Sequence, residues 1–252
     1  MSRTGTVFEE LAGGSGVPLW VHPEWAERFP GVVQGTTGRG GEEAPFDLGL
    51  WGAQPAGEAL GNWRRLLEHT GAAGALHSRQ QHGVRLRINK PPSLDGLLVV
   101  EGYDGHLTGV AGVLLTVSVA DCVPVFLAGD QPGAVGVLHV GWRGVAGGMV
   151  EVGIRRMRGP VRLHCGPAIC GRCYEVGPEV HRAVHPDRPA PAGPLPIDLR
   201  AAIHQRALRA GVPAGRLTLS GHCTLCGPGG FFSHRRGDRE RQLGVIGLRA
   251  PA

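Results

Sequence analysis

Two apolar runs of strand length lie in the stretch 116–143, and each one leads to a reactive side chain. Cys122 comes directly after Asp121 behind the first run, and His139 lies near the end of the second run. A third candidate, His82, lies upstream in a polar turn. Thiolate and imidazole groups are zinc ligands, and a catalytic zinc site uses three protein ligands and leaves one position open. The three side chains therefore suggest a metal-assisted site held at the ends of buried strands.

Spacing alone does not single out this triple, because the chain has 12 histidines and 6 cysteines. The alternative is a buried thiol and two surface imidazoles that bind no common metal ion. The surrounding sequence has to decide between these two interpretations.

The stretches that position these residues alternate between strand and helix patterns. Helical spacing predicts a helix over 57–68, with Leu60, Trp63 and Leu67 on one face. Further helices are predicted over 144–157, 178–184 and 199–210, and strands over Ala75–His77, Val84–Ile88, Leu97–Glu101, Val113–Val119, Pro124–Leu127, Ala134–Val140, Val161–Cys165, Arg216–Ser220 and Gly244–Leu248. There is no internal repeat and no linker. We predict a single α+β domain of mixed β-sheets flanked by helices over 31–252, preceded by a poorly patterned segment, 1–30.

Composition narrows the class of protein. Hydrophobic residues make up 42% of the chain and charged residues 19%, which is typical of a globular protein. A formal net charge of +5 favours anionic ligands such as phosphate esters. It does not indicate nucleic-acid binding, because the arginines are scattered and have no aromatic residues interleaved with them.

The sequence shows no membrane segment. The longest apolar run, Gly109–Gly129, is interrupted by Asp121 and fits two strands better than one membrane helix. The first residues lack the apolar core of a signal peptide. We therefore expect a cytoplasmic protein whose cysteines are thiols or metal ligands rather than disulfides.

Five motifs occur in order along the chain. They are Q-x-H-G at Gln80–Gly83, A-D-C-x-P-V at Ala120–Val125, H-x-G-W-R-G at His139–Gly144, G-P-A-I-x-x-x-C-Y-E-V-G at Gly166–Gly177, and C-T followed by F-F-S-H-R-R within Cys223–Arg236. Together they resemble the laccase-like multicopper polyphenol oxidase family, also called the YfiH type, over 33–248.

The resemblance implies a layered α/β sandwich with the site near one end of the strands. It implies that His82, Cys122 and His139 bind one zinc ion. It also implies purine nucleoside chemistry, since members are described as phosphorylases of adenosine, inosine, guanosine and methylthioadenosine and as adenosine deaminases. A zinc-bound water has a pKa of about 7 and can attack C6 of adenine. Nucleosides and phosphate are thus the expected partners, bound by a monomer or homodimer.

Charged residues within the motifs are candidates for catalysis and substrate binding. Asp121 is either a proton carrier or a structural hydrogen-bond acceptor at a strand end. Arg143 opens a predicted helix, so that backbone N–H groups and a guanidinium could converge on phosphate. Arg235 and Arg236 are further candidates. The alternative for all these arginines is pairing with surface carboxylates.

Two positions depart from the pattern of the family. Its T-R-x-G-G motif reads Thr37-Gly38-Arg39-Gly40-Gly41 here, within a stretch (36–41) that we predict to be a flexible turn. Its N-L-G motif reads Asp47-Leu48-Gly49. A carboxylate only accepts hydrogen bonds, whereas an amide also donates. If Arg39 and Asp47 contact the substrate, the substrate preference is shifted.

The remaining cysteines include two C-x-x-C pairs, Cys170 with Cys173 and Cys223 with Cys226. Two such pairs build a structural four-cysteine zinc site when they come together. The alternative is a set of buried or redox-sensitive thiols.

Three other functions remain open. The older family name suggests copper-dependent phenol oxidation, but multicopper oxidation needs many imidazole ligands, and only three ligands lie in the motifs. A hydrolase that edits a peptidoglycan precursor is implied for some members, with Cys122 and His139 as a nucleophile pair. The non-enzymatic alternative is a basic binding module, which the scattered arginines disfavour.

Overall fold

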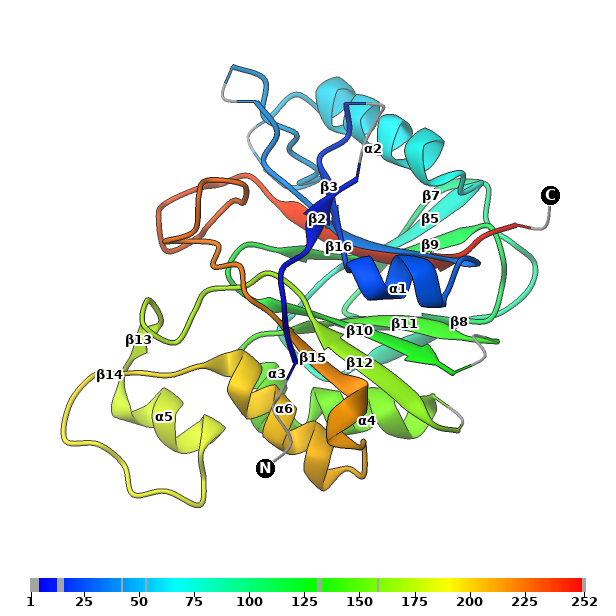
Figure 1. Ribbon diagram of the computed structural model, residues 1–252. Coiled ribbons are helices and arrows are strands. Elements are labelled where there is room, and N and C mark those ends of the chain that lie inside the picture. Colours follow the sequence, from blue (N-terminus) through cyan, green and yellow to red (C-terminus); the bar gives the residue numbers. More distant parts are fainter. Residues whose placement is uncertain are drawn as a thin grey trace.

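Two seven-stranded β-sheets form the centre of the molecule in the computed structural model (Figure 1). The structure describes residues 5–12, 16–41, 43–52, 54–130, 133–157 and 159–250. In order across the sheet, sheet A contains β1 (Gly5–Val7), β15 (Leu217–Ser220), β12 (Val161–Cys165), β10 (Val123–Gly129), β11 (Val135–Val140), β8 (Gly105–Thr108) and β6 (Leu86–Asn89). Sheet B contains β2 (Glu10–Leu11), β3 (Leu19–Val21), β4 (Val32–Thr37), β16 (Gln242–Leu248), β9 (Val113–Val119), β5 (Gly74–Arg79) and β7 (Gly96–Glu101).

Helices cover the outer faces of the two sheets. The long helix α2 (Ala56–Thr70) packs on sheet B, and α1 (Pro23–Arg28) lies at one side of the space between the sheets (Figure 1). On the outer face of sheet A lie α3 (Trp142–Gly147), α4 (Met149–Arg156), α5 (Pro178–Val184) and α6 (Leu199–Arg209). A two-stranded ribbon, β13 (Glu175–Val176) with β14 (Leu195–Pro196), and the short 3₁₀ helix η1 (Ala214–Arg216) complete the described elements. No helix in the described ranges is long and apolar enough to cross a membrane.

Each layer boundary has its own apolar core. Phe126 of β10 and Val117 of β9 are fully buried between the two sheets. Trp63 of α2 belongs to the core beneath sheet B's outer face, and Ile203 of α6 to the core on sheet A's outer face. Strands that are buried on both faces read as continuous apolar runs, which explains the patterns in 113–140. The predicted α+β class and layered, helix-flanked sandwich are confirmed.

Three local predictions are wrong. The helix predicted over 144–157 is divided in two, because Gly148 ends α3 in the left-handed conformation (φ 83°). Residues Thr36 and Thr37 are not in a flexible turn but are buried in β4, between β3 and β16. On α2, Leu60 is 50% exposed, and the buried stripe consists instead of Ala59, Trp63, Leu66 and Thr70.

The segment to which the sequence assigned no structure contributes to both sheets. β1 pairs with β15 in sheet A, while β2 and β3 extend sheet B beyond β4. These strands are two or three residues long, which is too short for a hydrophobic period to be visible. Residues 1–4 and 13–15 of the segment lie outside the described ranges.

Removing the Phe126 ring should show how much the layer between the sheets stabilises the fold. Phe126 is fully buried there, and we expect Phe126→Ala to lower the free energy of unfolding by about 3–5 kcal/mol. The control, Leu60→Ala on the exposed face of α2, should change it by less than about 0.5 kcal/mol. Equilibrium urea unfolding measures both, and equal losses would contradict the layer assignment.

Candidate active site

Three strand ends bring His82, Cys122 and His139 together. His82 lies in the turn after β5, Cys122 in the turn that joins β9 to β10, and His139 in β11. Their ligand atoms all lie within 4.8 Å of one another, and the two imidazole rings are nearly perpendicular, with centroids 4.8 Å apart. His139 is buried, Cys122 is half-buried and His82 is exposed. The cluster could therefore hold a metal ion that is reached from one side.

The local backbone is shaped to make this convergence possible. His82 (φ 58°) and Asp121 (φ 84°) are the two described non-glycine residues with a positive φ. Such a conformation costs about 1–3 kcal/mol and is concentrated at functional sites. Gly141, two residues after His139, leaves space for the thiol, since a Cβ there would lie 2.9 Å from the Cys122 sulfur. Steric conflict with the Cys122 sulfur thus explains why the H-x-G-W-R-G motif has a glycine at this position.

The buried carboxylate of Asp104 supports two of the three side chains. It accepts a hydrogen bond from Nδ1 of His139 at 2.9 Å, which directs Nε2 toward the cluster. It also accepts from the backbone N–H groups of His82 (2.8 Å), Gly83 (2.8 Å) and Gln81 (3.2 Å). A carboxylate that holds a ligand histidine in this way is a common feature of zinc sites. Sequence reasoning missed Asp104, because it lies in none of the five motifs.

The pKa values of Cys122 and His139 are shifted in the directions that favour a thiolate beside a protonated imidazole. Burial raises the pKa of the Cys122 thiol, but His139 and His82 outweigh burial and bring that pKa down to about 6. Burial lowers the pKa of His139, but the Cys122 thiolate and Asp104 raise it to about 9. The thiolate form that a metal ion or an electrophile needs is thus favoured near neutral pH.

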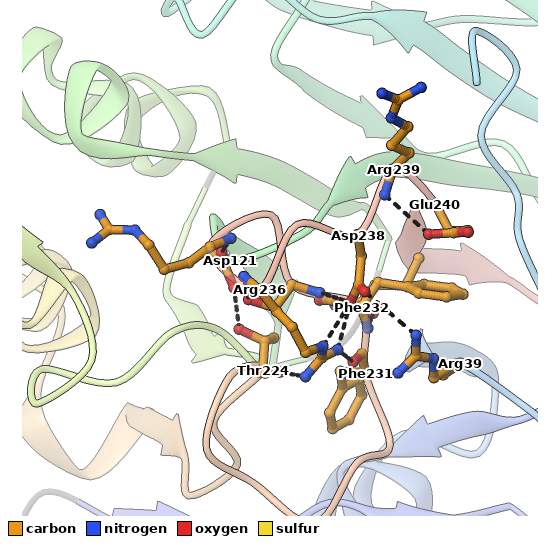
Figure 2. A network of polar contacts seen from close by, with 12 residues as sticks. Arg39, Asp121, Thr224, Phe231, Phe232, Arg236, Asp238, Arg239 and Glu240 are labelled. Carbon is orange, nitrogen blue, oxygen red and sulfur yellow. Dashed lines mark hydrogen bonds and ion pairs between the residues drawn. The ribbon is translucent and has the colours of Figure 1, made fainter. Parts of the chain in front are cut away.

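Asp121 uses its carboxylate for structural hydrogen bonds. Oδ1 accepts from the Thr224 hydroxyl at 2.6 Å, and Oδ2 accepts from the backbone N–H of Arg235 at 2.7 Å (Figure 2). Of the two roles considered for this residue, the geometry favours the structural one. Asp121 fixes the turn that presents Cys122.

A cavity of about 390 Å³ opens over the three ligand side chains. Its lining adds Trp51, His234, Arg239 and Arg241, none of which the sequence singled out as site residues. The Trp51 side chain is 49% exposed and stacks on the buried His77 ring, with centroids 5.5 Å apart and planes at 23°. An indole held in this way and exposed to a cavity is a surface on which a flat heterocycle can stack.

The predicted anion-binding arginines, Arg143 and Arg235, are engaged by other contacts. The Arg143 guanidinium stacks on Trp142 at 4.2 Å, at the start of α3. That of Arg235 lies 5.3 Å from the Tyr174 ring and donates to the carbonyl of Glu175. The pKa of Tyr174 is raised, because burial and Cys122 outweigh the opposing effect of Arg235 and Arg143. Neither arginine lines the 390 Å³ cavity.

Arg39 and Asp47 border a separate polar cavity of about 860 Å³. Arg39 pairs with Asp238 at 3.4 Å and lies over the Phe232 ring. Asp47 is buried and accepts from the backbone N–H groups of Gly49 and Arg241, both at 2.8 Å. Since Gly49 and Arg241 line the 390 Å³ cavity, Asp47 shapes that cavity from behind.

The two C-x-x-C pairs also meet. The sulfur atoms of Cys170, Cys173, Cys223 and Cys226 lie within 4.8 Å of one another, and none of the four forms a disulfide. This group too could hold a metal ion.

Comparison with known proteins is consistent over nearly the whole chain. Residues 33–249 match the family described as multi-copper polyphenol oxidoreductase laccase. The purine nucleoside phosphorylase YlmD of Geobacillus stearothermophilus is 35% identical over 255 residues, which is 89% of this chain and 93% of that protein. The crystal structure of YlmD from the same organism superposes with a TM-score of 0.84 at 30% identity, covering 97% of this chain and all of that one. Adenosine deaminase RL5, from an unknown prokaryotic organism, is 38% identical over 152 residues, 54% of this chain and 58% of that protein.

Replacing Asp104 should test whether it positions the cluster. Asp104→Asn keeps the size of the side chain but turns an NH₂ group toward backbone and imidazole donors, so that His139 loses its fixed orientation. We expect the affinity for zinc to fall about 10–100-fold, measured by competition with a chelating dye. The control Asp95→Asn, an exposed aspartate, should leave it unchanged. Equal affinities for the two variants would rule out a positioning role for Asp104.

Proposed function

The chain belongs to the multi-copper polyphenol oxidoreductase laccase family, and we propose that it is a zinc-dependent purine nucleoside phosphorylase that also deaminates adenosine. The observation that carries this proposal is the His82–Cys122–His139 cluster at a cavity whose walls include a stacking indole and cationic side chains. The relative YlmD is a purine nucleoside phosphorylase and the relative RL5 an adenosine deaminase, which supports the same two activities.

The donor set suits zinc. Two imidazoles and a thiolate leave a fourth position of a tetrahedron open, as in catalytic zinc sites. Blue-copper centres also use two histidines and a cysteine, commonly with a weak axial methionine. The two described methionines, Met149 and Met157, belong instead to the core beneath α3–α6. Among the described residues only one metal-ligand cluster contains histidine, whereas multicopper oxidation needs several.

The cavity suits a nucleoside and an anion. Its volume of about 390 Å³ lies within the range of small-molecule sites. Trp51 would stack on the purine, while Arg239 would bind phosphate. The guanidinium of Arg241 is engaged by the carbonyls of residues 238–240. That of Arg239 extends away from the ion-pair network (Figure 2) and has no carboxylate partner within the described ranges.

Each residue has a distinct part in the proposed reactions. In phosphorolysis the bond from C1′ of ribose to N9 of the purine breaks, C1′ joins a phosphate oxygen, and the purine takes up a proton. Arg239 holds the phosphate against the ribose, and His234 on the same wall can supply the proton. A bound zinc ion would act as a Lewis acid, which acidifies water for deamination or draws electron density from a substrate atom. Arg143 and Arg235 add positive potential from the Tyr174 side.

Product analysis tests the proposal directly. Zinc-loaded protein incubated with adenosine should release adenine and ribose 1-phosphate only when phosphate is present, as measured by liquid chromatography and mass spectrometry. Inosine formed both with and without phosphate would show the adenosine deamination that we expect in addition to phosphorolysis. After chelation, zinc rather than copper should restore turnover. Untouched adenosine in protein that contains zinc would refute the nucleoside assignment.

The Cys122→Ser variant separates a metal ligand from a nucleophile. Because the thiolate is a proposed ligand, we expect the variant to lose both turnover and zinc at the His82 cluster, as measured by elemental analysis. Lost turnover with full metal content would instead favour the alternative in which Cys122 and His139 act as a nucleophile pair in a hydrolase.

Two substitutions test the roles of the cavity walls. Loss of a stacked aromatic costs about 1–3 kcal/mol, so Trp51→Ala should raise KM for the nucleoside about 5–150-fold, and Trp51→Phe should restore most of the loss. Arg239→Ala should raise KM for phosphate and not KM for the nucleoside. The control is Arg64→Ala on the exposed face of α2, which should change neither. A uniform loss of kcat in both wall variants would contradict these binding roles.

A further inference from the structure

The four cysteines 170, 173, 223 and 226 have the spacing of a tetrahedral metal site. Sγ of Cys170 and Sγ of Cys226 are 3.8 Å apart, and all four sulfur atoms lie within 4.8 Å of one another. Thiolates at about 2.3 Å from a zinc ion, at the corners of a tetrahedron, are about 3.8 Å apart. In a disulfide the two sulfur atoms would be about 2.0 Å apart. The sulfur atoms are therefore close enough for one ion to be bound by four thiolates.

The backbone of both C-x-x-C turns is arranged around these sulfur atoms. The N–H groups of Cys170 and Cys226 point to Sγ of Cys223, at 3.3 and 3.4 Å. These hydrogen bonds fix the position of the Cys223 sulfur relative to the other ligands. The second turn closes tightly through Gly227, where a Cβ would lie 2.3 Å from the carbonyl oxygen of Cys223. This backbone holds the ligands in place before any ion binds.

Residues in and next to the same two turns donate hydrogen bonds to Asp121, the residue before Cys122. Thr224, inside the second turn, donates its hydroxyl to the Asp121 carboxylate at 2.6 Å (Figure 2). Ile169, just before the first turn, donates its N–H to the Asp121 carbonyl at 3.1 Å. A further bond, from the N–H of Thr224 to the carbonyl of Ala168 at 3.2 Å, joins the two turns to each other. Asp121, with its positive φ of 84°, is thus fixed from both sides.

The second turn also supports the loop of residues 235–241, which is rich in arginine. Arg236 donates from Nη1 to the carbonyl of Thr224 at 3.2 Å and pairs with Asp238, which in turn pairs with Arg39 (Figure 2). The proposed phosphate ligand Arg239 is the next residue in this loop. A disturbance of the cysteine cluster would therefore reach both the Cys122 turn and this wall of the cavity.

We propose that Cys170, Cys173, Cys223 and Cys226 bind a zinc ion of their own, and that this ion holds the Asp121–Cys122 turn in the shape that places the Cys122 sulfur beside His82 and His139. The ion has a structural role, because four protein ligands leave no position open for a substrate. Its binding depends neither on nucleoside chemistry nor on occupation of the His82 cluster.

Zinc content measured by elemental analysis on the purified full chain tests the site. The Cys170→Ser/Cys226→Ser variant should hold one zinc ion per chain fewer than the natural sequence, whatever the His82 cluster binds. The control Cys165→Ala alters a buried cysteine outside both clusters and should retain the full content. Equal zinc content in the natural chain and the double variant, or iron in place of zinc, would overturn the proposal.

A second measurement does not depend on whether the double variant folds. In the Cys122→Ser protein, X-ray absorption at the zinc edge should show four sulfur ligands at about 2.3 Å. Zinc without sulfur ligands, or no remaining zinc, would overturn the assignment.

Hydrogen exchange tests the link to the Cys122 turn. Amide protons of residues 120–122 should exchange faster in Cys170→Ser/Cys226→Ser than in the natural chain. Thr224→Val, which keeps the four cysteines but removes the hydroxyl that Asp121 accepts, should keep the zinc and also speed exchange in this turn. Unchanged exchange in the double variant would refute the structural link.

Discussion

The buried Asp104 carboxylate is the point at which the two sheets are joined at the candidate site. It precedes β8 of sheet A and accepts from the ring of His139 in β11, a neighbouring strand of that sheet. It also accepts three backbone N–H groups of the turn that follows β5 of sheet B. A charge with no exposed surface is stable only when its hydrogen bonds are satisfied. The positions of His82 and His139 relative to each other therefore depend on this one group.

The sandwich supplies the remaining constraint. Strands β10 and β11 pair so that Val123 lies opposite Val140, which brings Cys122 to the side of Gly141. A slip of one residue would turn His139 away from the cluster, because side chains alternate between the two faces of a strand. The apolar layer around Phe126 makes such a slip costly, and in this way packing far from the ligands holds the site in register.

The cationic side chains that the proposed chemistry uses fall into two groups. Arg235 lies beside Tyr174, and neither Arg235 nor Arg143 lines the 390 Å³ cavity, whereas Arg239 and Arg241 do. Arg39 and Asp47, at which the chain departs from the family pattern, border the separate 860 Å³ cavity, whose wall shares Arg239 with the 390 Å³ cavity. Their influence on substrate preference would be exerted through the wall rather than by contact.

The sequence alone determined the class of the fold, most strands and helices, and the identity of the His82, Cys122 and His139 candidates. Continuous apolar runs and ordered motifs are local signals, and they are legible without knowing which strands pair. Tertiary structure alone decided the rest. Asp104 matters because β8 lies beside β11, and Trp51 because its indole stacks on His77 at the edge of a cavity. Asp121 was open to two interpretations, and its hydrogen bond with the distant Thr224, 103 positions along the chain, favours the structural one. Such roles arise from contacts between residues that are far apart in sequence, and no local pattern of residue types records them.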